Sequence, residues 1–108
     1  MKIIKTYSNF ETANKKLIYK ENKHKSGIYR WTNKITNDTY IGNAINLSAR
    51  LRQYFSNKFL LKEKLKNNSI IYRALLKYGY SNFYLHILEY CDKSITIKRE
   101  QCYIDLFR

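Results

Sequence analysis

Two short triplets, one arginine and one glutamate are the residues of this 108-residue chain whose chemistry could combine at a single site. The triplets are Gly27–Tyr29 and Tyr40–Gly42, and each joins a glycine and a phenol to an isoleucine. Arg50 offers a guanidinium fork that binds paired phosphate oxygens, and Glu100 offers a carboxylate that suits a hard divalent cation. Together these groups indicate chemistry on a phosphate ester.

Glu100 has the most unusual setting of these residues. On the final predicted helix it lies between Ile97 and Ile104 on the apolar stripe. An inward carboxylate costs roughly several kcal/mol unless a cation or hydrogen-bond donors satisfy it. Glu100 is therefore either a ligand for a metal ion or a partly exposed residue at the stripe edge that pairs with an arginine.

Helical geometry distinguishes Arg50 from its neighbour Arg52. On a helix over Leu47–Phe55, Arg50 borders the apolar stripe beside Tyr54, whereas Arg52 projects almost oppositely. Arg50 can therefore lean over a sheet while Arg52 faces solvent. Arg50 either stabilises charge on a phosphate in the transition state or packs over tyrosine rings.

The tyrosines are less specific, because the chain contains eleven of them and most tyrosines are core or stacking residues. A phenol with a pKa of about 10 is a poor base at neutral pH, and it becomes effective only beside a cation that stabilises the phenolate. Gly27 and Gly42 fit ordinary strand ends or bulges, and they equally fit a close approach of backbone to a phosphate.

Periodicity and turn residues predict the elements that position these side chains. Apolar and polar residues alternate in three segments, which predicts three strands, and turn residues between the first two predict a hairpin. In three further segments apolar residues recur at helical spacing, which predicts three helices. Residues 59–66 fit either a helix or a loop. The predicted elements are strands Ser26–Thr32, Thr39–Gly42 and Phe83–Glu89, and helices Leu47–Phe55 (capped by Asn46), Ile70–Tyr78 (capped by Asn68 or Ser69, ended by Gly79) and Ile95–Phe107 (opened by Ser94). The order β-β-α-α-β-α predicts a small α+β domain.

The first 25 residues are interpreted as a basic N-terminal tail or a poorly packed helix. Apolar residues are scattered there, and the stretch from Asn14 to Lys25 is polar enough to remain solvated. The predicted domain therefore comprises residues 26–108.

A net charge of +13, from 21 lysines and arginines against 8 acids, indicates a polyanionic partner. The basic run from Lys58 to Lys66, followed by Arg73 and Lys77, either follows a nucleic-acid backbone or forms a solvated face. No apolar run approaches the ~18–20 residues that span a bilayer, so no membrane helix is expected. The cysteines and histidines lack the spacing of a zinc site.

The chain resembles the GIY-YIG nuclease family over about residues 26–107. The resemblance is carried by the two triplets, Arg50 and Glu100. The resemblance implies a three-stranded antiparallel sheet flanked by three helices. It also implies cleavage of double-stranded DNA with one divalent ion, Mg²⁺ or Mn²⁺, and no organic cofactor. In such a nuclease Glu100 is the sole metal-binding side chain and Arg50 neutralises developing charge. Tyr29 is the base that activates water, and Tyr40 is its hydrogen-bonding partner. Tyr54 stands where relatives often carry histidine, which leaves open which group takes the proton.

Segments Lys20–Asn33, Tyr72–Gly79 and Arg99–Gln101 resemble intron-encoded homing endonucleases of fungal mitochondria. That resemblance implies a mitochondrial, organelle-encoded protein. Such relatives continue into an asparagine after the last helix and a separate DNA-binding region, whereas this sequence stops at Arg108. We therefore expect a nuclease domain with a truncated C-terminal end and weak, poorly specific cleavage.

Two functions follow from these residues. The endonuclease hypothesis predicts that the phenols, the guanidinium and the carboxylate converge on one pocket around a bound ion. The alternative is a non-catalytic or degenerate basic module that binds nucleic acid through its charge and its interleaved aromatic residues.

Overall fold

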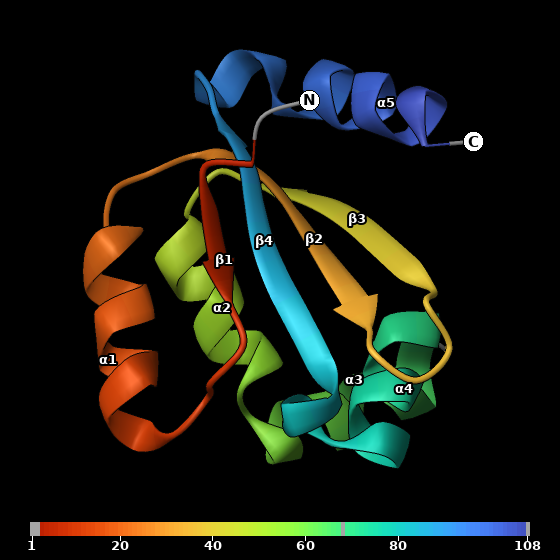
Figure 1. The fold of residues 1–108 in the computed structure, drawn as a ribbon. Coiled ribbons are helices and arrows are strands. Elements are labelled where there is room, and N and C mark those ends of the chain that lie inside the picture. Colours follow the sequence, from red (N-terminus) through yellow and green to blue (C-terminus); the bar gives the residue numbers. More distant parts are fainter. Residues whose placement is uncertain (1–2, 68, 108) are drawn as a thin grey trace.

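The computed structural model describes residues 3–67 and 69–107, except for the side chains of residues 64–67. These residues fold around one antiparallel sheet, with helices between and after its strands (Figure 1). The elements are β1 (Lys5–Tyr7), α1 (Thr12–Glu21), β2 (Gly27–Asn33), β3 (Thr39–Ala44), α2 (Leu47–Tyr54), α3 (Asn57–Asn67), α4 (Ile70–Tyr78), the 3-10 turn η1 (Tyr80–Asn82), β4 (Phe83–Tyr90), the 3-10 turn η2 (Lys93–Ile95) and α5 (Thr96–Leu106).

The strands of the sheet lie in the order β1-β4-β2-β3, and each neighbouring pair is antiparallel. β2 and β3 form the predicted hairpin, in which Tyr29 lies opposite Gly42 and Trp31 lies opposite Tyr40. Because side chains alternate across a strand, Tyr29, Trp31 and Tyr40 share one face of the sheet, and Asn43 belongs to the other. β3 lies at one edge of the sheet, so the hairpin carries the candidate tyrosines to that edge.

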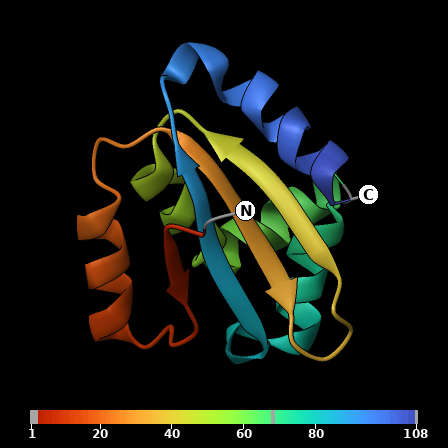
Figure 2. The ribbon, with the colours of Figure 1, turned by 45° about the horizontal axis from the view of Figure 1, so that its top comes forward.

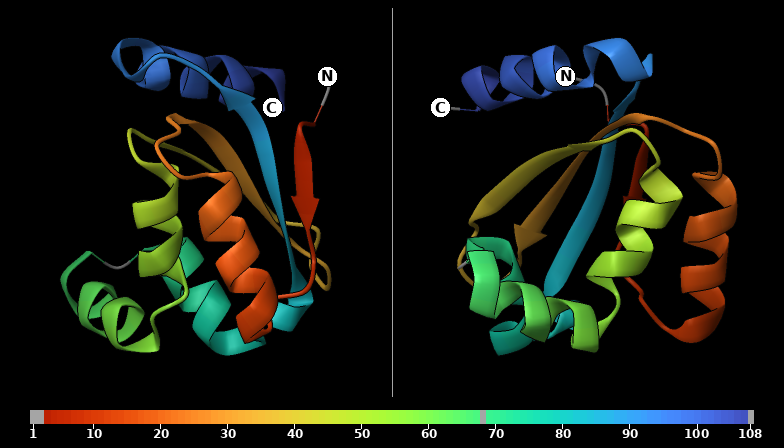
Figure 3. Two further views of the ribbon diagram at one scale, coloured as in Figure 1. Left: turned by 90° about the vertical axis from the view of Figure 1, so that its left-hand side faces the viewer. Right: turned by 180° about the vertical axis from the view of Figure 1, so that it is seen from behind.

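The helices divide between the two faces. Helices α1 to α4 lie behind the sheet in the view of Figure 1, whereas α5 crosses the end at which β2 begins and runs along β3 (Figures 2 and 3). α5 packs against β3 and β2. We call the side that carries Tyr29 and Trp31 the core face, and the side that carries Arg30 and Asn43 the α5 face.

The hydrophobic core lies between the core face and α1 to α4. Trp31 from β2, Leu51 from α2 and Leu85 from β4 are each 0% exposed. Aromatic side chains extend this core, because Trp31 packs edge-on against Phe55 and Phe83. β2, the strand that carries Tyr29, therefore packs on the hydrophobic core on the side of the sheet on which α2 lies.

Local signals explain where α2 and α4 begin and end. The Asn46 side chain accepts a hydrogen bond from the Ala49 amide and caps α2, and Ser69 caps α4 in the same way. Asn68, the other predicted cap, lies outside the described residues. Gly79 ends α4 at φ +82°, a left-handed conformation that glycine adopts without strain. The predicted starts of both helices and the predicted end of α4 are confirmed, whereas α2 ends at Tyr54, one residue before the predicted Phe55.

Residues 3–25 do not form the predicted tail. β1 pairs with β4, and Ile18 of α1 is fully buried. The Tyr7 hydroxyl donates to Glu21, 2.8 Å away, and Asn22 donates to Tyr7. Of the two interpretations of this segment, the solvated tail was wrong, whereas a helix is present over Thr12–Glu21. α1 attaches to the core through one buried isoleucine and a polar network, which give almost no apolar periodicity.

The α+β class with an antiparallel sheet is confirmed, but the described part of the chain has four strands and five α-helices, not three of each. Residues 59–66, left open between helix and loop, lie within α3. The last helix begins at Thr96, after a turn that Asp92, not Ser94, caps. Across the ranges 3–67 and 69–107, no helix combines the length and apolar character needed to cross a bilayer.

Candidate active site

Tyr29 and Tyr54 form a hydrogen-bonded pair of phenols beneath the core face. Their hydroxyl oxygens are 2.9 Å apart, and their rings meet edge-on with centroids 5.6 Å apart. Each residue is only 3% exposed. β2 supplies Tyr29, and the last turn of α2 supplies Tyr54, so the pairing of strand and helix fixes their separation.

Arg50 lies against this pair and joins it to a third phenol. Its Nη2 donates to the Tyr72 hydroxyl at 2.7 Å and to the Tyr54 hydroxyl at 3.4 Å, while Nη1 donates to Gln53 at 3.0 Å. The guanidinium carbon is 4.4 Å from the centroid of the Tyr54 ring. Both interpretations of Arg50 are thus compatible: it packs over tyrosine rings, and it faces them with a cation that lacks a carboxylate partner among the described residues.

Tyr72 of α4 is a site residue that the sequence did not single out. Its hydroxyl accepts the shortest hydrogen bond that Arg50 makes, and its side chain is buried. In the sequence, Tyr72 is one of several apolar positions on the stripe of the predicted helix. Its role becomes visible only in the structure, where it accepts a hydrogen bond from Arg50 of another helix. Three tyrosines and one arginine therefore form what we call the phenol cluster: Tyr29, Tyr54, Tyr72 and Arg50.

The two predicted glycines serve different purposes. A Cβ added to Gly42 would collide with the hydroxyl and ring of Tyr29. Gly42 therefore leaves the space that the Tyr29 phenol occupies beside β3. A Cβ added to Gly27 would instead meet the backbone of Glu89 on β4. The contact at Gly27 supports the ordinary strand interpretation, because the close neighbour is sheet backbone.

Tyr40 does not pair with Tyr29. Its side chain is half-buried and packs against the core, and no hydrogen bond within the described residues joins its hydroxyl to the phenol cluster. Burial first, then the nearby Asp38 carboxylate, raises the pKa of Tyr40. The partner of Tyr29 is Tyr54, which the sequence analysis placed only as a substitute for histidine.

Glu100 lies on the α5 face, apart from the phenol cluster. Its Oε1 accepts a hydrogen bond from Asn43 Nδ2 at 2.6 Å, and its side chain is half-buried. Asn43 follows Gly42 on β3, so its side chain points to the opposite face from Tyr29. The edge strand therefore separates the carboxylate from the phenols, and the structure does not bring all the predicted groups into one enclosed pocket.

A bidentate ion pair fixes α5, and with it Glu100, to the sheet. Arg99 Nε and Nη2 donate to the two Glu89 oxygens at 2.8 and 2.7 Å, and the Tyr103 hydroxyl donates to the same carboxylate at 2.9 Å. Hydrogen bonds from Arg99 and Tyr103 hold the pKa of Glu89 below its ordinary value. Arg30 adds a contact from β2, with its guanidinium 4.8 Å from the Phe107 ring.

Burial and charge act in opposite directions on the phenol cluster. Burial raises the pKa of Tyr29, whereas the Arg50 charge and the hydrogen bond with Tyr54 lower it. Burial and the neighbouring Tyr29 raise the pKa of Tyr54 well above its ordinary range. Burial lowers the pKa of Arg50, but the adjacent phenols raise it by more. Both phenols are therefore protonated at neutral pH.

Glu100 is the predicted metal ligand, and its surroundings test that prediction. Within residues 3–67 and 69–107 no three His, Cys, Asp or Glu side chains gather as a metal cluster. Mg²⁺ usually keeps several waters and binds one or two carboxylates plus substrate phosphate oxygens, so a lone carboxylate suits it. The amide of Asn43 could present its oxygen to a cation after a side-chain flip, because the two ends of an amide have the same shape. The donor set therefore fits an ion that relies on substrate and water.

Arg73 and Lys77, the predicted nucleic-acid contacts, lie one turn apart on the exposed side of α4. Lys77 Nζ is 5.1 Å from the centroid of the Tyr78 ring. Within the described part of the chain, no hydrogen bond, ion pair or cation–π contact joins the side chain of either residue to the phenol cluster. The side chains of Lys64 and Lys66, from the same basic run, lie outside the described residues.

With this geometry established, the chain can be placed in a class. Residues 25–108 match the model of the GIY-YIG catalytic domain, and the chain belongs to the GIY-YIG family. β1 and α1 precede the matched range.

Individual relatives give a finer comparison. The chain is 33% identical over 84 residues to probable intron-encoded endonuclease 1 of Neurospora crassa, across 78% of this chain and 25% of the relative. It thus spans about a quarter of that relative's length. Its fold is similar to the catalytic domain of the homing endonuclease I-TevI, with 31% identity and a TM-score of 0.56 over 75% of this chain and 86% of that domain. A mutant of that catalytic domain gives 33% identity and a TM-score of 0.58, over 75% of this chain and 81% of the mutant chain. The chain therefore contains a GIY-YIG nuclease domain of the homing-endonuclease type.

Proposed function

We propose that residues 25–108 hydrolyse phosphodiester bonds of double-stranded DNA with the help of one divalent cation. The observation that carries this proposal is the position of Arg50, which lies between the Tyr54 and Tyr72 hydroxyls and beside Tyr29. Membership of the GIY-YIG family and similarity to intron endonuclease domains support the choice of DNA as substrate.

Arg50 binds the scissile phosphate. Neutral hydroxyl and amide oxygens now accept its hydrogen bonds. A phosphate is a stronger acceptor, because it is ionised and its paired oxygens match the fork of the guanidinium in two parallel hydrogen bonds. The guanidinium also neutralises the negative charge that grows on the phosphate as water attacks, which is the larger part of its contribution.

Tyr29 acts as the base in its ionised form, which it reaches by releasing its own phenolic proton to solvent before the attack. The water oxygen bonds to phosphorus as the bond to the leaving oxygen breaks, and the departing water proton passes to the Tyr29 oxygen. Burial raises the pKa of both phenols, but the hydrogen bond between them lowers the pKa of Tyr29 and raises that of Tyr54, so Tyr29 is the preferred base. Gly42 keeps the Tyr29 phenol next to the edge strand, and Tyr40 contributes to the packing of the same face.

Glu100, with Asn43 beside it, would hold the divalent ion, which when bound supplies positive charge for the phosphate and the leaving oxygen. Glu100 and Arg50 approach β3 from opposite faces, so a DNA backbone lying along this sheet edge would meet both groups. Arg73 and Lys77, exposed on α4, extend the cationic surface on the Arg50 side.

Nicking of a supercoiled plasmid in Mg²⁺ or Mn²⁺ tests the proposal. The unaltered chain is expected to convert plasmid to the nicked form, and Glu100→Ala to lose this activity. Asp105→Asn is the matched control, because it removes an exposed carboxylate from the same helix. Absence of nicking by the unaltered chain at high concentration, or equal nicking by Glu100→Ala, would contradict the proposal.

A second candidate function is a module that binds nucleic acid without cutting it. The location of Glu100 on the opposite face from Tyr29 favours it, because an ion held by Glu100 lies across the edge strand from the proposed base. This module would bind duplex DNA with a steep salt dependence that Glu100→Ala and Arg50→Ala leave unchanged.

The similarity to a fungal intron-encoded endonuclease supports a mitochondrial, organelle-encoded origin. Mapping the reading frame to organellar or nuclear DNA tests this origin directly.

A further inference from the structure

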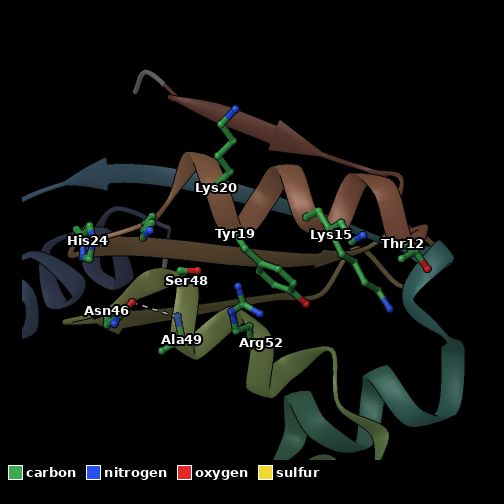
Figure 4. A pocket seen from close by; sticks show the side chains of 11 residues that line it. Thr12, Lys15, Tyr19, Lys20, His24, Asn46, Ser48, Ala49 and Arg52 are labelled. Atoms are coloured by element: carbon green, nitrogen blue, oxygen red, sulfur yellow. Dashed lines mark hydrogen bonds between the residues drawn. The ribbon is translucent and has the colours of Figure 1, made fainter.

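A hollow of about 890 Å³ lies between α1 and α2, on the side of α2 away from the phenol cluster (Figure 4). We call it the α1–α2 groove. Its lining includes no aspartate or glutamate. The positively charged or titratable residues that line it are Lys15, Lys16, Lys20, Lys23, His24 and Arg52.

We propose that the α1–α2 groove binds the sugar-phosphate backbone of duplex DNA, as a contact separate from the catalytic residues. The choice of DNA as the polyanion rests on the proposed function. The existence of an anion-binding groove rests only on the residues that line it.

Uncompensated charge is the first argument. Lys16, Lys23 and Arg52 are exposed, and none makes an ion pair in the described part of the chain. The nearby acid on α1, Glu21, instead bonds to Lys5 and Tyr7. Cations held side by side repel one another unless a polyanion neutralises them, so this surface favours a ligand with several negative charges.

The position of Arg52 is the second argument. Its guanidinium carbon lies 4.1 Å from the centroid of the Tyr19 ring, which α1 projects toward α2. Stacking on an aromatic face orients a guanidinium and leaves its N–H groups free to donate at their edge. Lys20 lies at the rim, where its side chain points away from Arg52 (Figure 4).

The dimensions of the groove also suit a nucleic-acid backbone. α1 has ten residues, so it is about 15 Å long, which equals about four steps of ~3.4 Å along the axis of a DNA duplex. Arg50 and Arg52 project from opposite sides of α2. The diameter of a helix with its side chains is about 10–12 Å, which is close to the ~12 Å width of the DNA major groove. One duplex can therefore contact the α1–α2 groove and the phenol cluster together.

The groove depends on a segment outside the matched family domain. Residues 25–108 match the family, whereas one wall of the groove is α1, Thr12–Glu21. The buried side chain of Ile18 holds that wall against the core. The groove is thus formed where the additional N-terminal segment packs on the nuclease domain.

The test compares two double variants that each remove two positive charges. Lys16→Gln with Lys23→Gln changes the groove, and Lys93→Gln with Lys98→Gln changes exposed lysines near and on α5. Affinity for a short DNA duplex is measured over a range of salt concentrations without divalent ions, so that no cleavage occurs. The plot of log affinity against log salt is expected to lose about two units of slope in the groove variant, near 0.9 for each phosphate contact, and little in the control.

Equal slopes for the two double variants would overturn the proposal. So would a groove-dependent attachment to anionic lipid vesicles without an effect on duplex binding, or saturation of the groove by millimolar inorganic phosphate with duplex binding unchanged. Thermal unfolding checks that both variants fold, which their exposed positions predict. Plasmid nicking is scored separately: groove-dependent binding without any nicking rejects the proposed nuclease activity and leaves the groove in place.

Discussion

The two faces of the sheet carry the proposed catalytic groups in different settings. On the core face, Tyr29 and Tyr54 are buried, and Arg50 has acceptors for both of its terminal nitrogens. On the α5 face, Glu100 is half-buried and has one hydrogen-bond partner, Asn43. The phenol cluster is part of the hydrophobic core, whereas the carboxylate is attached to the sheet by a helix.

This difference indicates a division of roles. Groups that sit in a packed core keep their geometry before the substrate arrives, which is what electrostatic stabilisation of a transition state requires. A half-exposed carboxylate with one neutral partner can instead exchange that partner for an ion and water. A change on the core face should therefore alter both activity and stability, while a change on the α5 face should mainly alter ion binding or the attachment of α5.

The largest effect is expected for Arg50→Ala. If Arg50 stabilises the transition state, plasmid nicking should slow by about 10²–10³-fold, as for the loss of one oxyanion-stabilising donor. Arg50→Lys keeps the charge but loses the fork, and should recover only part of that rate. Lys93→Ala is the control for loss of an exposed cation. Equal rates for Arg50→Ala and the control would contradict a catalytic role for the core face.

Next in size is the effect of removing the anchor of α1. Ile18→Ala should reduce the free energy of unfolding by about 2–3 kcal/mol, because the side chain is fully buried at the margin of the core. Leu17→Ala is the matched control, since Leu17 is 47% exposed and its loss should change stability by less than about 0.5 kcal/mol. Urea unfolding measures both. Equal small changes would show that α1 packs on the core face only loosely.

A smaller effect is expected where the edge strand meets the phenol cluster. Gly42→Ala should cost about 1–2 kcal/mol, because the added methyl group and the Tyr29 ring require the same space. In a Tyr29→Ala background the same substitution should cost much less, and this double-mutant cycle isolates the contact. Additive costs would place the strain of Gly42→Ala elsewhere than at Tyr29.

The sequence predicted most of the family-matched fold, because its elements have strong local signals. Asn46 and Ser69 cap their helices, Gly79 ends α4, and Trp31 and Leu85 show strand alternation. β1 was not predicted, and a helix was only one of two interpretations of the segment that forms α1. A three-residue edge strand and a helix with a single fully buried residue, Ile18, give too little periodicity to distinguish them from a solvated tail.

The candidate site was predicted less completely, because residue type and spacing do not fix contacts between distant elements. The placement of Arg50 beside Tyr54 followed from helical geometry and holds in the structure. The contact of Arg50 with Tyr72 and that of Glu100 with Asn43 depend on how α4 and α5 pack, which local patterns do not encode. The position of β3 between Glu100 and Tyr29 likewise depends on where α5 packs, which no local pattern indicates.

The smallest expected effect is a pH dependence of the free energy of unfolding that arises from Glu89 on the α5 face and not from the phenols of the core face. Hydrogen bonds from Arg99 lower the pKa of Glu89 in the folded chain, so the ionised carboxylate binds its proton less readily than in the unfolded chain, where its pKa is about 4.3. Its contribution to stability is therefore complete above the unfolded pKa and is lost as pH falls through the lower folded pKa. Urea unfolding between pH 6 and pH 3 should show Glu89→Gln less stable than the unaltered chain at pH 6, with the difference shrinking toward pH 3. Glu11→Gln, which alters an exposed carboxylate away from α5, should leave the pH dependence unchanged. If the curves of unfolding free energy against pH for Glu89→Gln and the unaltered chain are parallel, the ion pair does not fix α5. If the two curves converge toward pH 3, acid weakens the attachment of α5, the helix that carries Glu100. The uncharged phenols of the core face do not respond to this change in pH.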